Sequence, residues 1–130
     1  MGQNTVFTGK PWEASVPHAP ANISSGRLLH VSGITARLPD GSVAGPGDMS
    51  VQAEQVLQNI KDVYAAANAS TDNIVRMTIY VTDLDAWRAA SGIITELYSS
   101  RPAATLIEIS RLAHPDMVLE IETTAELAST

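Results

Sequence analysis

The stretch NIVRMTIYVTD, residues 73–83, has the most regular pattern in the sequence. Within it Val75, Met77, Ile79 and Val81 alternate with Arg76, Thr78 and Tyr80. Successive side chains of a β-strand point to opposite faces, so the pattern predicts a strand over residues 74–81 with one face in the core. Asp83 or Asp85 follows, and either side chain can cap the start of a helix.

Helical patterns flank this strand on both sides. Before it, Asp48 or Ser50 can cap a helix whose apolar residues recur at steps of three and four, and Asn68 can end it. These apolar residues are Ala53, Val56, Leu57, Ile60, Val63, Tyr64 and Ala67. After the strand, a second helix face carries Leu84, Trp87, Ser91, Ile94 and Tyr98, flanked by Leu97. Gly92 within this helix costs up to ~1 kcal/mol relative to alanine, so we expect close packing against it.

Three further strands are predicted, over residues 28–33, 105–110 and 118–124. The first is a short apolar run that ends at Gly33, which is typical of a buried strand, whereas the other two alternate. Two helices against one sheet predict an α+β sandwich with helices on one face. The other face would carry Tyr80, Glu108 and Glu120, and a mixed surface of this kind favours packing against other subunits.

The composition fits one globular domain over residues 1–130 and argues against several classes of protein. The formal net charge is −6, and nucleic-acid binding requires a basic face, so no nucleic-acid partner is expected. The absence of cysteine excludes disulfides and thiol nucleophiles, and the three histidines lack metal-ligand spacing. No apolar run approaches the ~18 residues of a membrane span and no secretory signal is visible, so we expect a cytoplasmic protein without a membrane partner.

Several segments between Gly26 and Ala125 together match the pattern of one family. They are Gly26 to Gly33, Asp40-Gly41 with Val43, Gln55 to Ile60, Asn73 to Asp83, Arg101-Pro102-Ala103 and Leu119 to Glu122. In this order and spacing the chain resembles the Rid family, also called the YjgF/YER057c/UK114 or endoribonuclease L-PSP family. The resemblance implies a bacillus-type chorismate-mutase-like α+β fold, with a mixed sheet of about six strands and two helices packed on one face.

The resemblance also implies an assembly and a chemistry. Members form homotrimers with ligand clefts between subunits, and the best-known ones hydrolyse reactive imines and enamines to ketones and ammonia. They use no metal and no organic cofactor. The family glutamate that positions or activates water corresponds to Glu120.

The other family site residues correspond to different residue types in this chain. The family's Pro-Ala-Arg-Ser/Thr motif binds a substrate carboxylate through its arginine, but here Ala104 stands at the arginine position and Thr105 follows. Ile34 replaces a glutamine, Ser91 an asparagine and His18 a tyrosine. Alanine cannot hold a carboxylate by charge, and losing such a contact costs ~1.5–3 kcal/mol. The archetypal 2-iminoacid deaminase activity is therefore not implied for this chain.

The predicted site has a catalytic and a substrate-binding part. Glu120 is the predicted acid/base and His18 a second proton relay, with a solvated strand carboxylate and a surface loop histidine as the alternatives. Arg37 could supply the charge missing at Ala104, although a solvated loop arginine is the simpler interpretation, and Trp12 could line a pocket. The substrate-binding set is Ala104, Thr105, Ile34, Ser91, Arg37 and Trp12.

Two functions remain open at this point. The first is an enzyme that acts on a small imine, enamine or related carbonyl metabolite by hydrolysis, cyclisation or tautomerisation. The second is a non-catalytic trimer that binds a small ligand or a protein partner, which the loss of polar groups at Ala104, Ile34 and Ser91 favours. A ribonuclease is disfavoured, because RNA contact needs cations and the net charge is −6.

Overall fold

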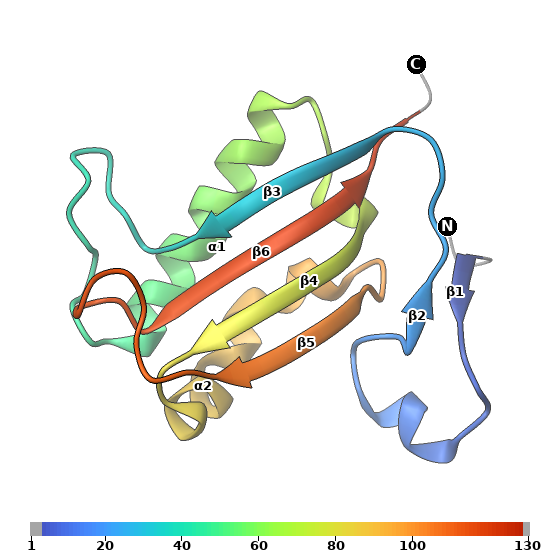
Figure 1. Ribbon diagram of the computed structural model, residues 1–130, viewed down its shortest axis with the longest axis horizontal. Coiled ribbons are helices and arrows are strands. Elements are labelled where there is room, and N and C mark those ends of the chain that lie inside the picture. Colours follow the sequence, from blue (N-terminus) through green and yellow to red (C-terminus); the bar gives the residue numbers. More distant parts are fainter. Residues whose placement is uncertain (1–3, 129–130) are drawn as a thin grey trace.

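The computed structural model describes residues 4–128 as an α+β sandwich, in which helices pack on one face of a mixed sheet (Figure 1). The main sheet has four strands in the order β3-β6-β4-β5, and two short N-terminal strands pair separately. The strands are β1 (Thr5–Val6), β2 (Ala21–Asn22), β3 (Leu28–Ile34), β4 (Ile74–Val81), β5 (Ala103–Glu108) and β6 (Leu119–Glu126). The predicted α+β fold is confirmed. The six strands of residues 4–128 are divided between a four-stranded and a two-stranded sheet.

The strand predicted over residues 74–81 is β4, which lies inside the main sheet. It pairs antiparallel with β6 and parallel with β5. Met77, Ile79 and Val81 are fully buried, as predicted. At the start of the strand Ile74, and not Val75, faces the core. The register of β4 against β6 shifts just after Ile74, and a β-bulge of this kind reverses the alternation of side chains.

Helix α1 (Met49–Ala66) supplies the larger part of the helical layer. Asp48 is its N-cap, and Oδ1 of Asp48 accepts a hydrogen bond from the Val51 amide at 3.1 Å. Beyond the helix end Asn68 has a φ of 53°, a left-handed conformation that commonly follows a helix. The predicted apolar stripe packs on the sheet, with Ala53, Val56, Ile60 and Tyr64 buried. Within residues 4–128, no helix is both long and apolar enough to span a membrane.

The second predicted helix is divided into two parts. Helix α2 (Leu84–Ala90) is capped by Asp83 and continues into a 3-10 helix, η4 (Ser91–Tyr98), which is distorted at Ile94. The expected close packing at Gly92 is wrong, because within residues 4–128 no atom outside its chain neighbours and its own helix backbone lies within 4 Å of the position a Cβ would take there. Gly92 borders a cavity instead.

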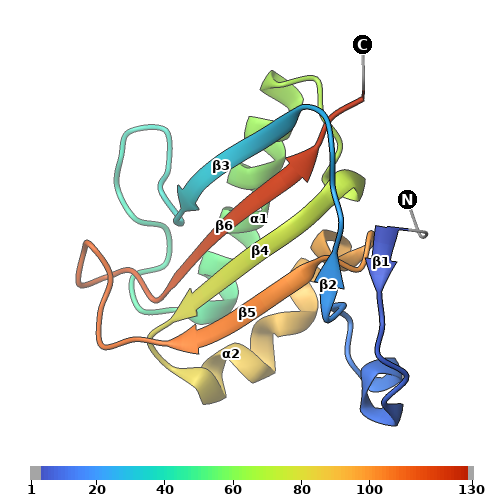
Figure 2. The ribbon, with the colours of Figure 1, turned by 45° about the vertical axis from the view of Figure 1, so that its right-hand side comes forward.

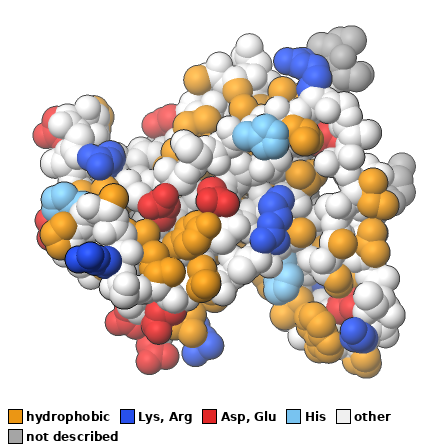
Figure 3. All heavy atoms as spheres, viewed as in Figure 1, with side chains coloured by type: hydrophobic (Ala, Val, Ile, Leu, Met, Phe, Trp, Pro, Cys, Tyr) orange, Lys and Arg blue, Asp and Glu red, His pale blue; other side chains and the backbone are white. Residues whose placement is uncertain are grey.

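The outer strands β3 and β5 are more exposed than the sequence suggests. In β3 Val31 is the one buried residue, because the strand lies at the sheet edge and not in its interior. β5 begins and ends two residues earlier than predicted, and its Leu106 and Ile107 are 43% and 45% exposed. Helices α1 and α2 lie behind the sheet (Figures 1 and 2). The uncovered face presents acidic, basic and hydrophobic side chains side by side (Figure 3).

The N-terminal arm, residues 4–22, lies beside the start of β5 (Figure 2). It contains β1, a 3-10 helix η2 (Pro11–Ser15) and β2. Ala19 is fixed to the main sheet by a bridge to Ala103, and its amide donates to the carbonyl of Pro102 at 3.0 Å. The arm therefore holds the residues just before Ala19 against the edge of the sheet.

Candidate functional site

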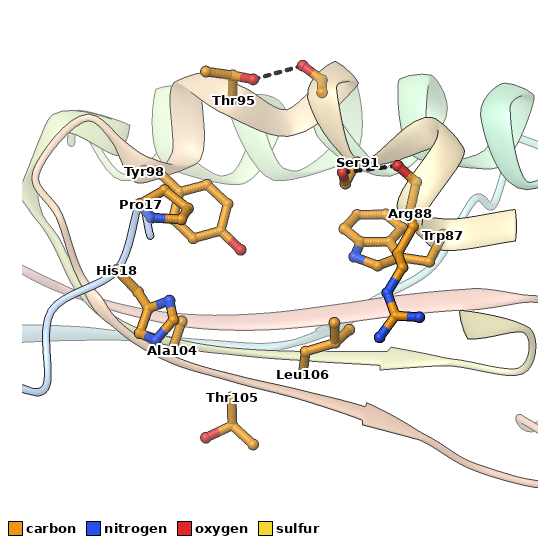
Figure 4. Close-up of a pocket in the computed structure, with 11 residues that line it drawn as sticks. Pro17, His18, Trp87, Arg88, Ser91, Thr95, Tyr98, Ala104, Thr105 and Leu106 are labelled. Atoms are coloured by element: carbon orange, nitrogen blue, oxygen red, sulfur yellow. Dashed lines mark hydrogen bonds between the residues drawn. The ribbon is translucent and has the colours of Figure 1, made fainter. Parts of the chain in front are cut away.

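A cavity of about 350 Å³ lies between the edge strand β5 and the helices α2 and η4 (Figure 4). Residues from the arm, both helices and the strand line it: Pro17, His18, Trp87, Arg88, Ser91, Gly92, Thr95, Tyr98, Ala104, Thr105 and Leu106. The structure thus brings together four residues of the predicted site, namely His18, Ser91, Ala104 and Thr105.

The cavity exists because the helices cover β4 more completely than β5. Ala104 and Leu106 of β5 stand beside Met77 and Ile79 of β4, on the helix-covered face. Met77 and Ile79 are fully buried, whereas Leu106 is 43% exposed. Gly92 on the helix side and Ala104 on the strand side add little bulk. The result is a hollow with apolar walls, which is the usual character of a small-molecule site.

Some polar groups around the cavity already form hydrogen bonds within the protein, whereas others are available to a ligand. The hydroxyls of Ser91 and Thr95 donate to carbonyls three residues earlier, at 3.3 and 2.7 Å. The phenol of Tyr98 points toward the middle of the cavity (Figure 4). Burial raises the pKa of Tyr98, so the phenol remains a hydrogen-bond donor at neutral pH. Arg88 and His18 stand toward opposite ends of the cavity (Figure 4).

Arg101 holds the arm segment that carries His18. Its guanidinium donates to the carbonyl oxygens of Glu13, of Val16 at 3.0 Å and of His18 at 3.4 Å. It also lies 4.6 Å from the ring centre of Phe7, as a cation–π contact. Arg101 is therefore a structural residue of the arm.

Glu120 lies on the uncovered face of the sheet, away from the cavity. It stands opposite Tyr80 of β4, whose side chain shares this face. A Cβ on Gly33 would lie 1.8 Å from Oε2 of Glu120, so the carboxylate lies directly over this glycine. The β3 register shifts here, between Val31 and Ile34. None of the hydrogen bonds within residues 4–128 involves the Glu120 carboxylate.

The remaining predicted residues are dispersed. Ile34 and Arg37 border a second hollow of about 350 Å³ at the end of β3, and Arg37 donates to the carbonyl of Gly41 at 2.9 Å. Trp12 is 53% exposed on η2 and lines neither hollow. Thr105 borders the first cavity, but its side chain leaves β5 on the other side (Figure 4), where it accepts from Arg76 at 2.7 Å.

Among the cavity residues that the sequence analysis did not assign to the site are Arg88 and Tyr98, whose phenol faces the pocket. Arg88 precedes Ser91 by three residues, and side chains three apart lie on the same side of a helix. This spacing was the available signal for Arg88. Trp87 is buried, as expected of a core residue, and also forms part of the cavity wall.

Over residues 4–128, no three His, Asp or Glu side chains lie close enough together to hold a metal ion.

Comparison with known proteins places the chain in one family over nearly its whole length. The family model described as Endoribonuclease L-PSP matches residues 9–127. A RutC family protein from Pyrococcus abyssi is 30% identical over 126 residues, which cover 96% of this chain and 98% of that protein.

Solved structures agree with the sequence match. A Rid-family protein of unknown function from Yersinia pestis, YyfB, has a TM-score of 0.80 and 31% identity, covering 95% of this chain and 97% of that one. A YjgF/YER057c/UK114 family member from Mycobacterium tuberculosis has a TM-score of 0.66 and 27% identity, covering 95% and 98%. In sequence and in fold, the chain belongs to the Rid family.

Proposed function

We propose that the chain is a cytoplasmic enzyme that acts on a small imine, enamine or related carbonyl metabolite, in a cleft between two copies of the chain. Membership of the Rid family supports a role connected with small metabolites, and proteins of this family are typically small-molecule-binding homotrimers. The cavity of about 350 Å³ has room for such a ligand.

One observation carries the proposal of a shared cleft: the two parts of the site lie on opposite faces of one sheet. Ala104 shares the helix-covered face with buried Met77, whereas Glu120 shares the uncovered face with Tyr80. Within one chain the sheet separates the Glu120 carboxylate from the cavity. A second copy that offers its uncovered face to the β5 edge would bring its Glu120 and Gly33 to the cavity of the first.

The surroundings of Glu120 suit the activation of water. Its carboxylate lies over Gly33 at a β-bulge, on a face that the helices leave open. β-Bulges are frequent next to active sites, where they redirect side chains. The neighbouring Glu122 accepts a hydrogen bond from Tyr80 at 3.3 Å, whereas the carboxylate of Glu120 has no such contact among the described residues. Glu120 therefore keeps its acceptor oxygens available for a water molecule.

The proposed hydrolysis uses Glu120 as the general base. The carboxylate takes a proton from water as the water oxygen bonds to the imine carbon, and the C=N π pair moves to nitrogen. Glu120 returns this proton to the nitrogen, and a second proton passes from the new hydroxyl group to the nitrogen through Glu120 or His18. As the oxygen gives up that proton, the C=O bond forms, the C–N bond breaks and ammonia leaves. The products are a ketone and ammonia. In a tautomerisation or cyclisation, the same groups would move a proton without the addition of water.

The test compares Glu120→Gln with Glu122→Gln, a matched change two residues along the same strand and face. An amino-acid oxidase generates 2-imino acids from a panel of amino acids, and semicarbazide traps whatever imine escapes hydrolysis. We expect Glu120→Gln to reduce the rate at least ~10²-fold, as loss of a general base does, and Glu122→Gln to retain most of it. Equal activity of Glu120→Gln and wild type would refute the assigned role.

The same assay separates the enzyme from the alternative, a non-catalytic trimer. If wild-type protein leaves every imine to the trap but binds the corresponding 2-oxo acid, the binding trimer is the better description. Sedimentation of the full chain tests the assembly, since a monomer at assay concentration would refute the shared cleft.

A further inference from the structure

The cavity has a charge pattern that differs from that of the whole chain. The formal net charge is −6, with fourteen Asp and Glu residues. None of these residues lines the cavity, whereas Arg88 and His18 do. An arginine in a hollow with apolar walls and no carboxylate lining attracts an anion.

Arg88 has few protein contacts that would compete with a ligand. Its ion pair with Asp85, at 3.8 Å, joins side chains that are 69% and 96% exposed. Exposed pairs of this kind contribute only ~0–1 kcal/mol. No side-chain hydrogen bond within residues 4–128 uses its guanidinium as a donor. The donors of the guanidinium fork are thus available.

The Arg88 side chain points so that the N–H donors of its guanidinium lie at the cavity. Figure 4 shows the side chain extending from α2 toward β5, with its guanidinium beside Leu106. Ala104 projects from β5 on this same face. A guanidinium at position 104 would share a cavity of about 350 Å³ with that of Arg88, and two like charges at such range repel. Alanine at position 104 and arginine at position 88 are therefore compatible as a pair.

We propose that Arg88 is the anion-binding residue of this cavity, and that the ligand is a small monocarboxylate whose apolar body packs against Trp87 and Leu106. The guanidinium fork matches the two oxygens of a carboxylate. One arginine balances one negative charge, and the apolar walls suit a hydrocarbon body better than a phosphate dianion. This inference deepens the proposed function, because it assigns the substrate class of the same site.

The test measures binding without turnover. Phenylpyruvate is compared with phenylacetone, which keeps the ketone and ring but lacks the carboxylate, and with phenyl phosphate, by isothermal titration to the full-length chain. A charged hydrogen-bonded contact is worth ~1.5–3 kcal/mol, so wild type should prefer phenylpyruvate over phenylacetone by about 10- to 150-fold. Equal affinity for the two, or tighter binding of phenyl phosphate, would overturn the proposal.

Three variants assign the preference to a residue. Arg88→Gln should abolish it, whereas Lys61→Gln, which removes an equal charge on α1 beside Glu96, should retain it. Adding Ala104→Arg to Arg88→Gln should restore carboxylate binding from the opposite wall. A preference that survives Arg88→Gln would refute the role of Arg88, whatever the result for Glu120. Loss of activity in Glu120→Gln with the preference intact, by contrast, would leave both proposals standing.

Discussion

Replacing Gln52 by leucine tests how the protein joins α1 to two loops. Gln52 is fully buried in α1. Its amide nitrogen donates to the carbonyls of Gly45, at 3.1 Å, and of Asp116, at 2.7 Å. Its amide oxygen accepts from the Val118 amide at 2.9 Å, immediately before β6. One side chain therefore fixes the entry to α1 and the entry to the strand that carries Glu120.

The loss of stability in Gln52→Leu depends on which of the three backbone groups bonded to Gln52 keep another hydrogen-bond partner. The carbonyl of Gly45 still accepts from the Asp48 amide at 2.8 Å, and that of Asp116 from the Gly47 amide at 3.0 Å. The Val118 amide has no second acceptor among the described residues. Leaving one amide without a partner costs ~1–3 kcal/mol, and each of the other two lost bonds ~0.5–1.5 kcal/mol. We expect a loss of about 2–6 kcal/mol in the free energy of unfolding.

Chemical denaturation at fixed protein concentration measures this loss, since association contributes to the stability of an oligomer. The matched control is Gln58→Leu on the same helix, where an exposed amide bonds to Asp62 at 2.9 Å. Exposed pairs contribute little, so the control should stay within ~0.5 kcal/mol of wild type. A cost below 1 kcal/mol for Gln52→Leu would show that water or a backbone shift satisfies the amide of Val118, and would refute this reasoning.

Two further predictions concern the Glu120 side and the arm. Gly33→Ala places a Cβ 1.8 Å from Oε2 of Glu120, and the flexible carboxylate must move. We expect lost hydrolysis with little change in melting temperature, and unchanged activity would contradict the assigned position of Glu120. Hydrogen bonds from Thr8 lower the pKa of Glu13, so the stability of the arm is complete above the ordinary glutamate pKa of about 4.3 and is lost as the pH falls through the lower, folded value. Hydrogen exchange of residues 7–18 should show this acid loosening in wild type and not in Glu13→Gln.

The interior strand and the helix caps could be predicted from the sequence because local physics determines them. The alternation over residues 77–81 and the capping residues Asp48 and Asp83 are read from neighbouring positions alone. The errors lie where tertiary contacts decide. The bulge after Ile74 reverses the facing of Val75, and β3 is exposed because it forms an edge, which no pattern within residues 28–33 indicates.

The site was harder to predict than the fold because its residues belong to different faces. The sequence pattern shows that Glu120 and Glu122 share one face of their strand, but not which residues of β5 share that face of the sheet. The pairing register shows this. Ala104 stands beside buried Met77, whereas Ile107 stands beside Tyr80, which is opposite Glu120. Position 104 and Glu120 are thus separated by the sheet within one chain. If both act on one ligand, they must come from different copies, and the free chain then holds two incomplete halves of a site. Activity should therefore depend on assembly, and should fall with dilution below the dissociation constant of the oligomer.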